Sequence, residues 1–225
     1  MTTIKIRKKT PRIFRFIGIG LISLALISAV LVRTNETYQA VSLKQDAPIM
    51  LQVPPIAQSQ ATSCGEAVIV MAYNYAYPET PLNEAQVIAY ATENGYFTEE
   101  LEPFTSPANM VKITKNYTGE YSSGTVFNSS QGLALLIRHL KNNEPVIIDV
   151  LTSFADPTSG AHFVLVTGVA RDINDPTIIW IYYNNPLTGV NEAAPWDGET
   201  GVWHAWMNNP DPGGPGWWLT LSDPE

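Results

Sequence analysis

The sequence is poor in the side chains that usually build disulfides and metal sites. Among its 225 residues it has one cysteine, Cys64, and three histidines, His139, His162 and His204. A single cysteine excludes an intramolecular disulfide, and three histidines without a useful ligand spacing argue against a metal site. We therefore expect no metal and no cofactor. Cys64 is then either a small core residue or a nucleophile.

Basic residues are scarce after the first 33 positions. Seven of the 13 Lys and Arg residues lie at or before Arg33, where there is no acidic residue, so six remain against all 21 acidic residues. A domain this acidic repels phosphates, which excludes nucleic acid as a partner. Because 45% of the residues are apolar and 15% are charged, the chain can form a true core, and disorder is not expected.

Long apolar runs are absent except for one, residues 16–32, which follows the basic start. As a helix this run would be roughly 25 Å long, near the short limit for crossing a bilayer. We favour a signal anchor over a cleaved signal peptide, because the run is long and ends without a small-residue cleavage site. The positive-inside rule then places residues 1–15 in the cytoplasm and the acidic domain outside the cell membrane. Cleavage would instead give a secreted protein.

The remaining pattern predicts a linker over residues 34–48 and one domain over residues 49–225, with helices first and strands second. The predicted helices cover residues 64–77, 81–95, 106–119 and 129–143, and the predicted strands cover residues 49–53, 145–152, 162–171, 177–185 and 216–221. Thr62 or Ser63, Asn83 and Ser106 are the expected helix caps. Because helices and strands do not alternate, the fold class is α+β, a helical half packed on an antiparallel sheet.

Three other residues could act together with the Cys64 thiol: Gln58, which precedes it, and His162 and Asn185, which follow it. A thiol attacks as the thiolate, and a helix start or a neighbouring imidazolium lowers its pKa. Cys64 lies at a predicted helix start, His162 begins one strand and Asn185 ends the next, so a hairpin would bring His162 and Asn185 together. Gln58 carries an amide that could donate to an oxyanion.

These residues lie in three stretches that resemble one known family. "VPPIAQSQATSCGEA", "GAHFVLVTGV" and "YYNNPLTG" resemble the cysteine, histidine and third blocks of bacterial papain-like peptidases related to the bacteriocin-processing, double-glycine-leader family. The resemblance covers residues 50–222 and implies a papain-like fold and a cysteine peptidase acting on peptides or proteins. It also implies the roles: Cys64 as nucleophile, His162 as general base and acid, Asn185 as orienter and Gln58 as oxyanion donor.

The sequence departs from this family pattern in three ways. Asn185 stands where many relatives have aspartate, which leaves a neutral orienter. Glu66 follows Cys64-Gly65 where a small residue or proline is expected, and its carboxylate could raise the thiol pKa or pair elsewhere. No transporter is attached, so export of a leader peptide is not implied.

Two other functions remain open from the sequence. A papain-like amidase or acyltransferase would act on cell-wall or isopeptide substrates through the same thioester. A non-catalytic surface binding module would use the aromatic tail, residues 196–221, which holds five of the six tryptophans. We favour packing over ligand binding for these tryptophans.

Overall fold

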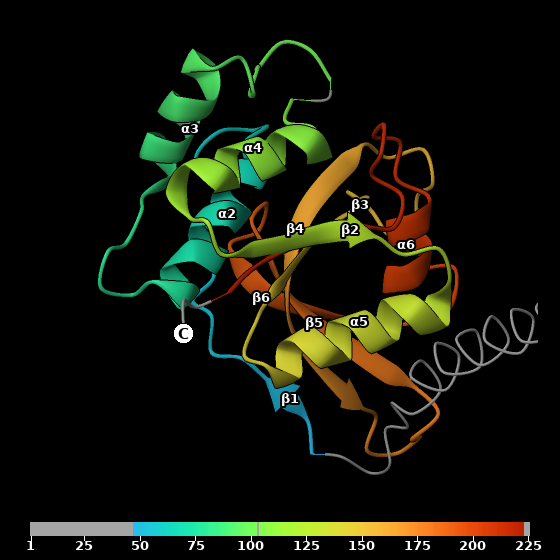
Figure 1. Ribbon diagram of the computed structural model, residues 1–225. Helices are drawn as coiled ribbons and strands as arrows, with labels where there is room; N and C mark the ends of the chain where they lie inside the picture. Colours follow the sequence, from blue (N-terminus) through green and yellow to red (C-terminus); the bar gives the residue numbers. More distant parts are fainter. Residues whose placement is uncertain (1–46, 103, 223–225) are drawn as a thin grey trace, which may run out of the picture. The chain divides into compact units, whose positions relative to one another are not determined.

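Helices dominate the first half of the domain and strands the second, as the sequence predicts (Figure 1). The computed structural model describes residues 47–102 and 104–222, which belong to the unit Gln45–Glu225. The helices are α2 (Cys64–Ala76), α3 (Glu84–Glu93), α4 (Pro107–Tyr117), α5 (Ser129–Lys141) and α6 (Val202–Met207). The strands are β1 (Ile49–Met50), β2 (Tyr121–Thr125), β3 (Val146–Leu151), β4 (Ala161–Arg171), β5 (Ile179–Asn185), β6 (Val190–Pro195) and β7 (Trp217–Leu221).

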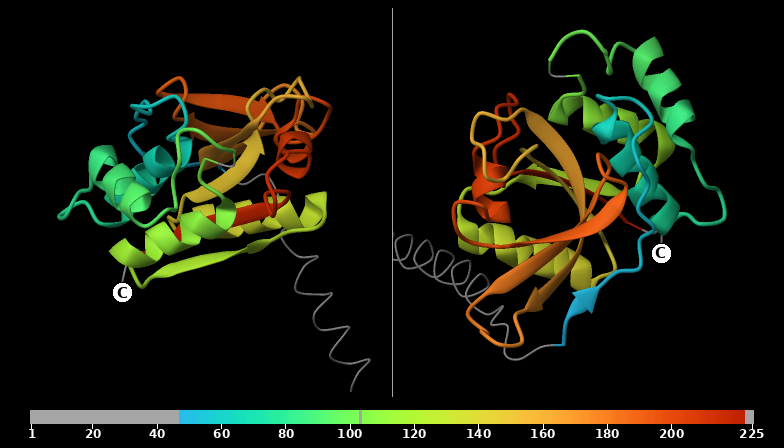
Figure 2. Two further views of the ribbon diagram at one scale, coloured as in Figure 1. Left: turned by 90° about the horizontal axis from the view of Figure 1, so that it is seen from above. Right: turned by 180° about the vertical axis from the view of Figure 1, so that it is seen from behind.

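All strands join one antiparallel sheet, which confirms the α+β class. The order is β2-β7-β3-β4-β5-β6, and β1 pairs with β4 outside this path. Helices α2, α3 and α4 gather on one side of the sheet, whereas α5 and α6 lie on the other side, in both the front and rear views (Figures 1 and 2). Helix α2 contacts β3, β4 and β7, and β4 carries the second sequence block.

The expected amino-terminal anchor, residues 16–32, lies outside the described residues. Within the part of the chain that the structure describes, none of the helices is both long and apolar enough to cross a bilayer.

Local capping explains why the predicted helices form. Asn83 and Gln86 make a capping box at α3, and Ser106 accepts a hydrogen bond from the Asn109 backbone N–H at α4. Ser63 is the N-cap residue of α2, but its hydroxyl does not cap the helix. It bonds instead to the Gln60 carbonyl at 3.2 Å and to the Glu84 carboxylate at 2.7 Å.

Helix α2 is the centre of the core. Its residues from Gly65 to Tyr73 are all buried, as its apolar sequence predicts. A Cβ atom added at Gly65 would lie 2.7 Å from the Met110 sulfur, so any larger residue there would require the Met110 side chain to move. Each fully buried Val or Ile contributes about 1.5–3 kcal/mol from removal of apolar surface from water. This packing fixes the position of the neighbouring Cys64.

Some elements differ from the sequence prediction. β1 ends at Met50 rather than at position 53, and β2, β6 and α6 were not predicted. His139 of α5 is 7% exposed, and its Nδ1 lies 2.5 Å from the Glu144 carboxylate. Trp196, Trp206 and Trp217 are buried, which confirms for these three that the tryptophans serve packing.

Candidate active site

The hairpin of β4 and β5 brings His162 and Asn185 together. The Nε2 atom of His162 lies 2.9 Å from the Asn185 Oδ1 atom. His162 is the second residue of β4 and Asn185 is the last of β5, and the two strands pair antiparallel with an irregularity between Val166 and Gly168. The contact between these two side chains is therefore the one that the sequence predicts.

The side-chain amide of Asn185 is hydrogen-bonded to the carboxylate of Glu192. Glu192 was not identified as a site residue from the sequence. The Asn185 amide nitrogen donates to both Glu192 oxygens at 3.2 Å. Glu192 also accepts from the Thr188 hydroxyl at 2.6 Å and from the Tyr183 hydroxyl at 3.2 Å. The β5–β6 register places Glu192 opposite Tyr183, diagonal to Asn185. A hairpin prediction over residues 185–192 could have found it.

These contacts determine which ring nitrogen of His162 can act as a base. Because the Asn185 amide nitrogen faces Glu192, its oxygen faces His162, and this oxygen can only accept a hydrogen bond. The proton of the neutral imidazole therefore lies on Nε2, and Nδ1 carries the lone pair. Burial lowers the pKa of His162, while the Asn185 hydrogen bond and the Glu192 charge raise it in part.

Cys64 is half-buried at the first position of α2, against β4. Burial, together with the smaller effects of the Glu66 and Asp149 charges, raises the pKa of its thiol to about 12, although the backbone N–H of Phe163 lowers it in part. The backbone N–H of Gly65, at the helix start, lowers this pKa as expected, but desolvation of the thiolate outweighs its effect. The resting site holds a neutral thiol.

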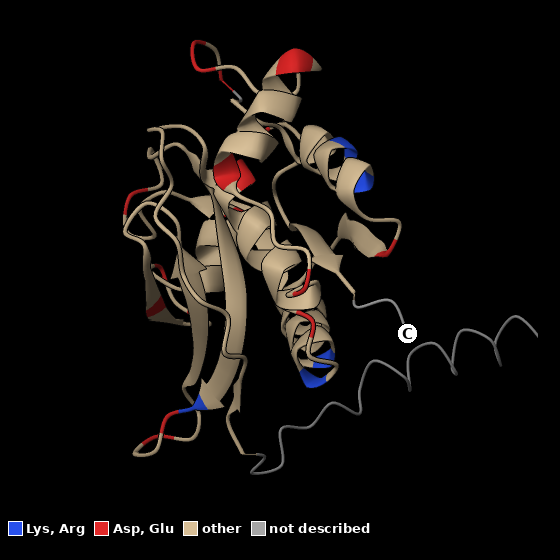
Figure 3. Cartoon of the chain, turned by 90° about the vertical axis from the view of Figure 1, so that its left-hand side faces the viewer, with Lys and Arg blue, Asp and Glu red and all other residues tan. Residues whose placement is uncertain are grey.

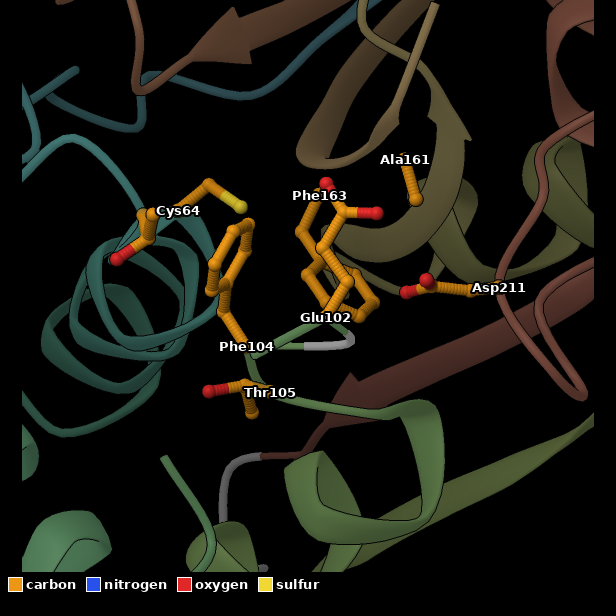
Figure 4. A pocket seen from close by; sticks show the side chains of 8 residues that line it. Cys64, Glu102, Phe104, Thr105, Ala161, Phe163 and Asp211 are labelled. Atoms are coloured by element: carbon orange, nitrogen blue, oxygen red, sulfur yellow. The ribbon is translucent and has the colours of Figure 1, made fainter. Parts of the chain in front are cut away.

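Cys64 and His162 face different hollows. Cys64 lines a pocket with both neighbours of His162 in β4, Ala161 and Phe163 (Figure 4). His162 lines a second cleft together with Asn185, Glu192 and Tyr183. This follows from the alternation of side chains along a strand. Over residues 47–102 and 104–222, no hydrogen bond joins the thiol to the imidazole.

Gln58 lies beside the third block but its amide points elsewhere. Its backbone N–H donates to the Pro186 carbonyl at 2.8 Å, which ties the loop before α2 to the residue after Asn185. Its side-chain nitrogen donates to the Gln60 carbonyl at 2.8 Å. The side-chain oxygen is buried, without a hydrogen-bond partner among the residues described. The amide nitrogen carries a second hydrogen, which the bond to Gln60 leaves available for another acceptor.

The Glu66 carboxyl both pairs with another residue and raises the pKa of the Cys64 thiol, the two alternatives that the sequence left open. One carboxyl oxygen accepts from the Thr105 hydroxyl at 2.7 Å, and the other is buried without a partner in the described ranges. Burial raises the pKa of Glu66 to about 7, against the Thr105 hydrogen bond, which lowers it. Its charge is one cause of the raised pKa of Cys64. In the described part of the chain, His, Cys, Asp and Glu side chains form no group of three that could hold a metal.

The comparison with known families identifies the domain. The model of the Peptidase_C39 like family matches residues 50–209, a stretch that includes Gln58, Cys64, His162, Asn185 and Glu192. None of the curated proteins matches the chain. At the family level, the match supports a cysteine peptidase, for which peptides or proteins are the substrates. The chain belongs to the Peptidase_C39 like family.

Proposed function

We propose that the protein is a papain-like cysteine peptidase that hydrolyses peptide bonds through Cys64, His162 and Asn185. The observation that carries this proposal is the 2.9 Å contact between His162 and Asn185. This contact leaves the imidazole of His162 with a lone pair on Nδ1. The backbone N–H of Phe163, the next residue in β4, interacts with the Cys64 sulfur. Nucleophilic catalysis requires a thiol, a base that can reach it and a side chain that orients the base, and the His162–Asn185 contact supplies the last two.

The first chemical step is attack with simultaneous proton transfer. The pKa of the Cys64 thiol is raised and that of His162 is lowered, so a resting thiolate–imidazolium pair is not the favoured state. Because the two side chains face different hollows in the structure, this step requires the sulfur to leave the Phe163 N–H and the two side chains to move together until the sulfur meets His162 Nδ1. The sulfur then attacks the peptide carbonyl carbon while Nδ1 accepts the thiol proton. The product is a tetrahedral oxyanion beside an imidazolium.

The second step releases the amine and then the acid. His162 gives its proton to the leaving nitrogen as the C–N bond breaks, which leaves a thioester on Cys64. Water then attacks the thioester with His162 again as the base, and the thiol is restored. The backbone N–H of Cys64, at the helix start, and the Gln58 amide are the proposed oxyanion donors. The Gln58–Pro186 backbone bond keeps that amide near the site.

We also propose that the peptidase acts outside the cytoplasm. The support is the order of charges along the chain: six Lys and Arg residues precede the apolar run of residues 16–32, and the acidic domain follows it. In this proposal the run is a single-pass anchor.

Substitution of the triad tests the catalytic proposal. Cys64→Ala in the full chain should abolish cleavage of a peptide library, and His162→Ala should lower kcat/KM by at least about 100-fold. His204→Ala is the matched control, because His204 lies on α6, where its Nδ1 contacts only the Asn208 amide. Mass spectrometry reads the products. If Cys64→Ala cleaves peptides as the wild type does, the thiol is not the nucleophile.

Added amine distinguishes hydrolysis from acyl transfer in the same assay. A peptidase gives the free carboxylate product even in the presence of glycine amide. An acyltransferase would give the amine adduct as its main product.

A further inference from the structure

The pocket that contains Cys64 also contains two carboxyl groups. Glu102 and Asp211 line it together with the rings of Phe104 and Phe163. The Cys64 sulfur and the Asp211 carboxyl project from opposite sides, with the two rings between them (Figure 4). We name these five residues the Cys64 pocket. Any side chain that enters it next to the scissile bond meets apolar ring surface first and negative charge beyond it.

A third carboxyl group lies beneath Asp211. Asp149, in β3, is 0% exposed. The polar groups near it are the Asp211 carboxyl and the His162 backbone N–H, and neither of its oxygens makes a hydrogen bond of ordinary geometry to a described residue. The Asp149 charge also acts on Cys64. Burial and the neighbouring Asp211 carboxyl raise the pKa of Asp149 well above its usual range, so these two carboxyl groups together favour binding of a proton or of a cation.

Among residues 47–102 and 104–222, none of the Lys and Arg side chains lines the Cys64 pocket. The Lys and Arg residues of the described part lie on α4, at the end of α5 and at the far end of β4, away from the Cys64 pocket (Figure 3). Burial raises the pKa of Asp211 to about 6, and the Glu102 charge raises it further, against the Asp149 hydrogen bond. These groups are therefore held close together without the charge that would stabilise them.

We propose that the Cys64 pocket selects peptides with a lysine or arginine beside the scissile bond, an inference that rests on the proposed function. The aliphatic stem of the basic side chain lies along Phe104 and Phe163. Its cation pairs with the Asp211 and Glu102 carboxylates that line the pocket. The strongly acidic domain attracts such peptides at longer range.

Matched peptides test this proposal in the full-length protein. A fluorogenic series carries lysine, arginine, norleucine or glutamine at each position flanking the bond cleaved in the library, and kcat/KM is measured for each. At one position, lysine or arginine should exceed norleucine by at least about tenfold, because norleucine has a similar stem without the cation. Equal kcat/KM values for lysine and norleucine at every position would overturn the inference and leave the peptidase intact.

Two variants locate the preference in this pocket. Asp211→Asn and Glu102→Gln should each lower the ratio of kcat/KM for the lysine peptide to that for the norleucine peptide by about fivefold or more. Glu93→Gln removes one exposed charge from α3 and should leave the ratio unchanged. A fall of the ratio in Glu93→Gln equal to that in the pocket variants would assign the preference to net charge and overturn the proposed site. Absence of cleavage of every peptide by the wild type would overturn the peptidase itself.

Discussion

At the residue scale, we propose that Asn185 and Glu192 together do what a single orienting aspartate would do. A neutral amide orients an imidazole but adds no charge to stabilise the imidazolium that forms during catalysis. Glu192 supplies that charge one residue farther away, through the two 3.2 Å bonds to the Asn185 amide nitrogen. Thr188 and Tyr183 fix the carboxylate in turn. Glu192 is thus a positioning residue for His162.

Removal of the Glu192 charge should change the pH dependence of the reaction. The Glu192 charge raises the pKa of His162, so Glu192→Gln should lower it. Since the neutral imidazole is the active base, the acid limb of the kcat/KM profile should move to lower pH, with kcat reduced about tenfold. Glu192→Asp should restore part of kcat. Glu120→Gln, an exposed charge before β2, is the control. An acid limb at the wild-type pH in Glu192→Gln would exclude this electrostatic role.

At the element scale, the sequence predicts what local residues determine and misses what packing determines. Helices α3 and α4 were predicted because Asn83 and Ser106 cap them through contacts within four residues. Strands β2 (YSSGT) and β6 (VNEAAP) were missed, because they are short edge strands with few β-branched or aromatic residues. The His162–Asn185 contact follows from strand order alone. The high pKa of Cys64 does not, because it depends on burial against β4 and on charges from Glu66 and Asp149.

Helix α2 carries a destabilising carboxyl group at Glu66, and this gives a prediction for stability. The pKa of Glu66 is about 7 in the folded protein against 4.5 for the free group, so the folded state binds the proton more tightly. Stability from this group is therefore complete below pH 4.5 and is lost as the pH rises to 7, by about 3 kcal/mol at most. Glu66→Gln should remove this loss. Its Tm should exceed that of the wild type at pH 8 by more than at pH 4.5, measured by calorimetry.

The matched control for Glu66 is Glu79→Gln, because Glu79 is exposed in the turn after α2. Its Tm difference from the wild type should be small and the same at both pH values. A Glu66→Gln difference that does not change between pH 4.5 and pH 8 would mean that the buried carboxyl is not the source of the pH dependence.

At the scale of the whole molecule, the proposed substrate preference and the proposed membrane anchor are compatible with each other. Three sequence blocks far apart in the chain meet at α2, β4 and β5, and a basic preference at the Cys64 pocket would suit an acidic domain held outside the membrane. The resemblance named the four residues of the site. It did not reveal the separate hollows of Cys64 and His162, because side-chain direction in β4 depends on the sheet register.

Membrane fractionation tests the topology that this arrangement requires. The full chain, with an epitope at each end, should stay in the membrane pellet after extraction at alkaline pH, because residues 16–32 are long enough for a tilted or thinned span. External protease should remove the carboxy-terminal epitope from spheroplasts and leave the amino-terminal one. A control chain with Ile22→Arg and Leu26→Arg should be lost from the pellet, since charge at the middle of a span is costly. Recovery of a shortened chain in the medium would identify a cleaved signal peptide, and an intact soluble chain inside the cell would exclude both forms.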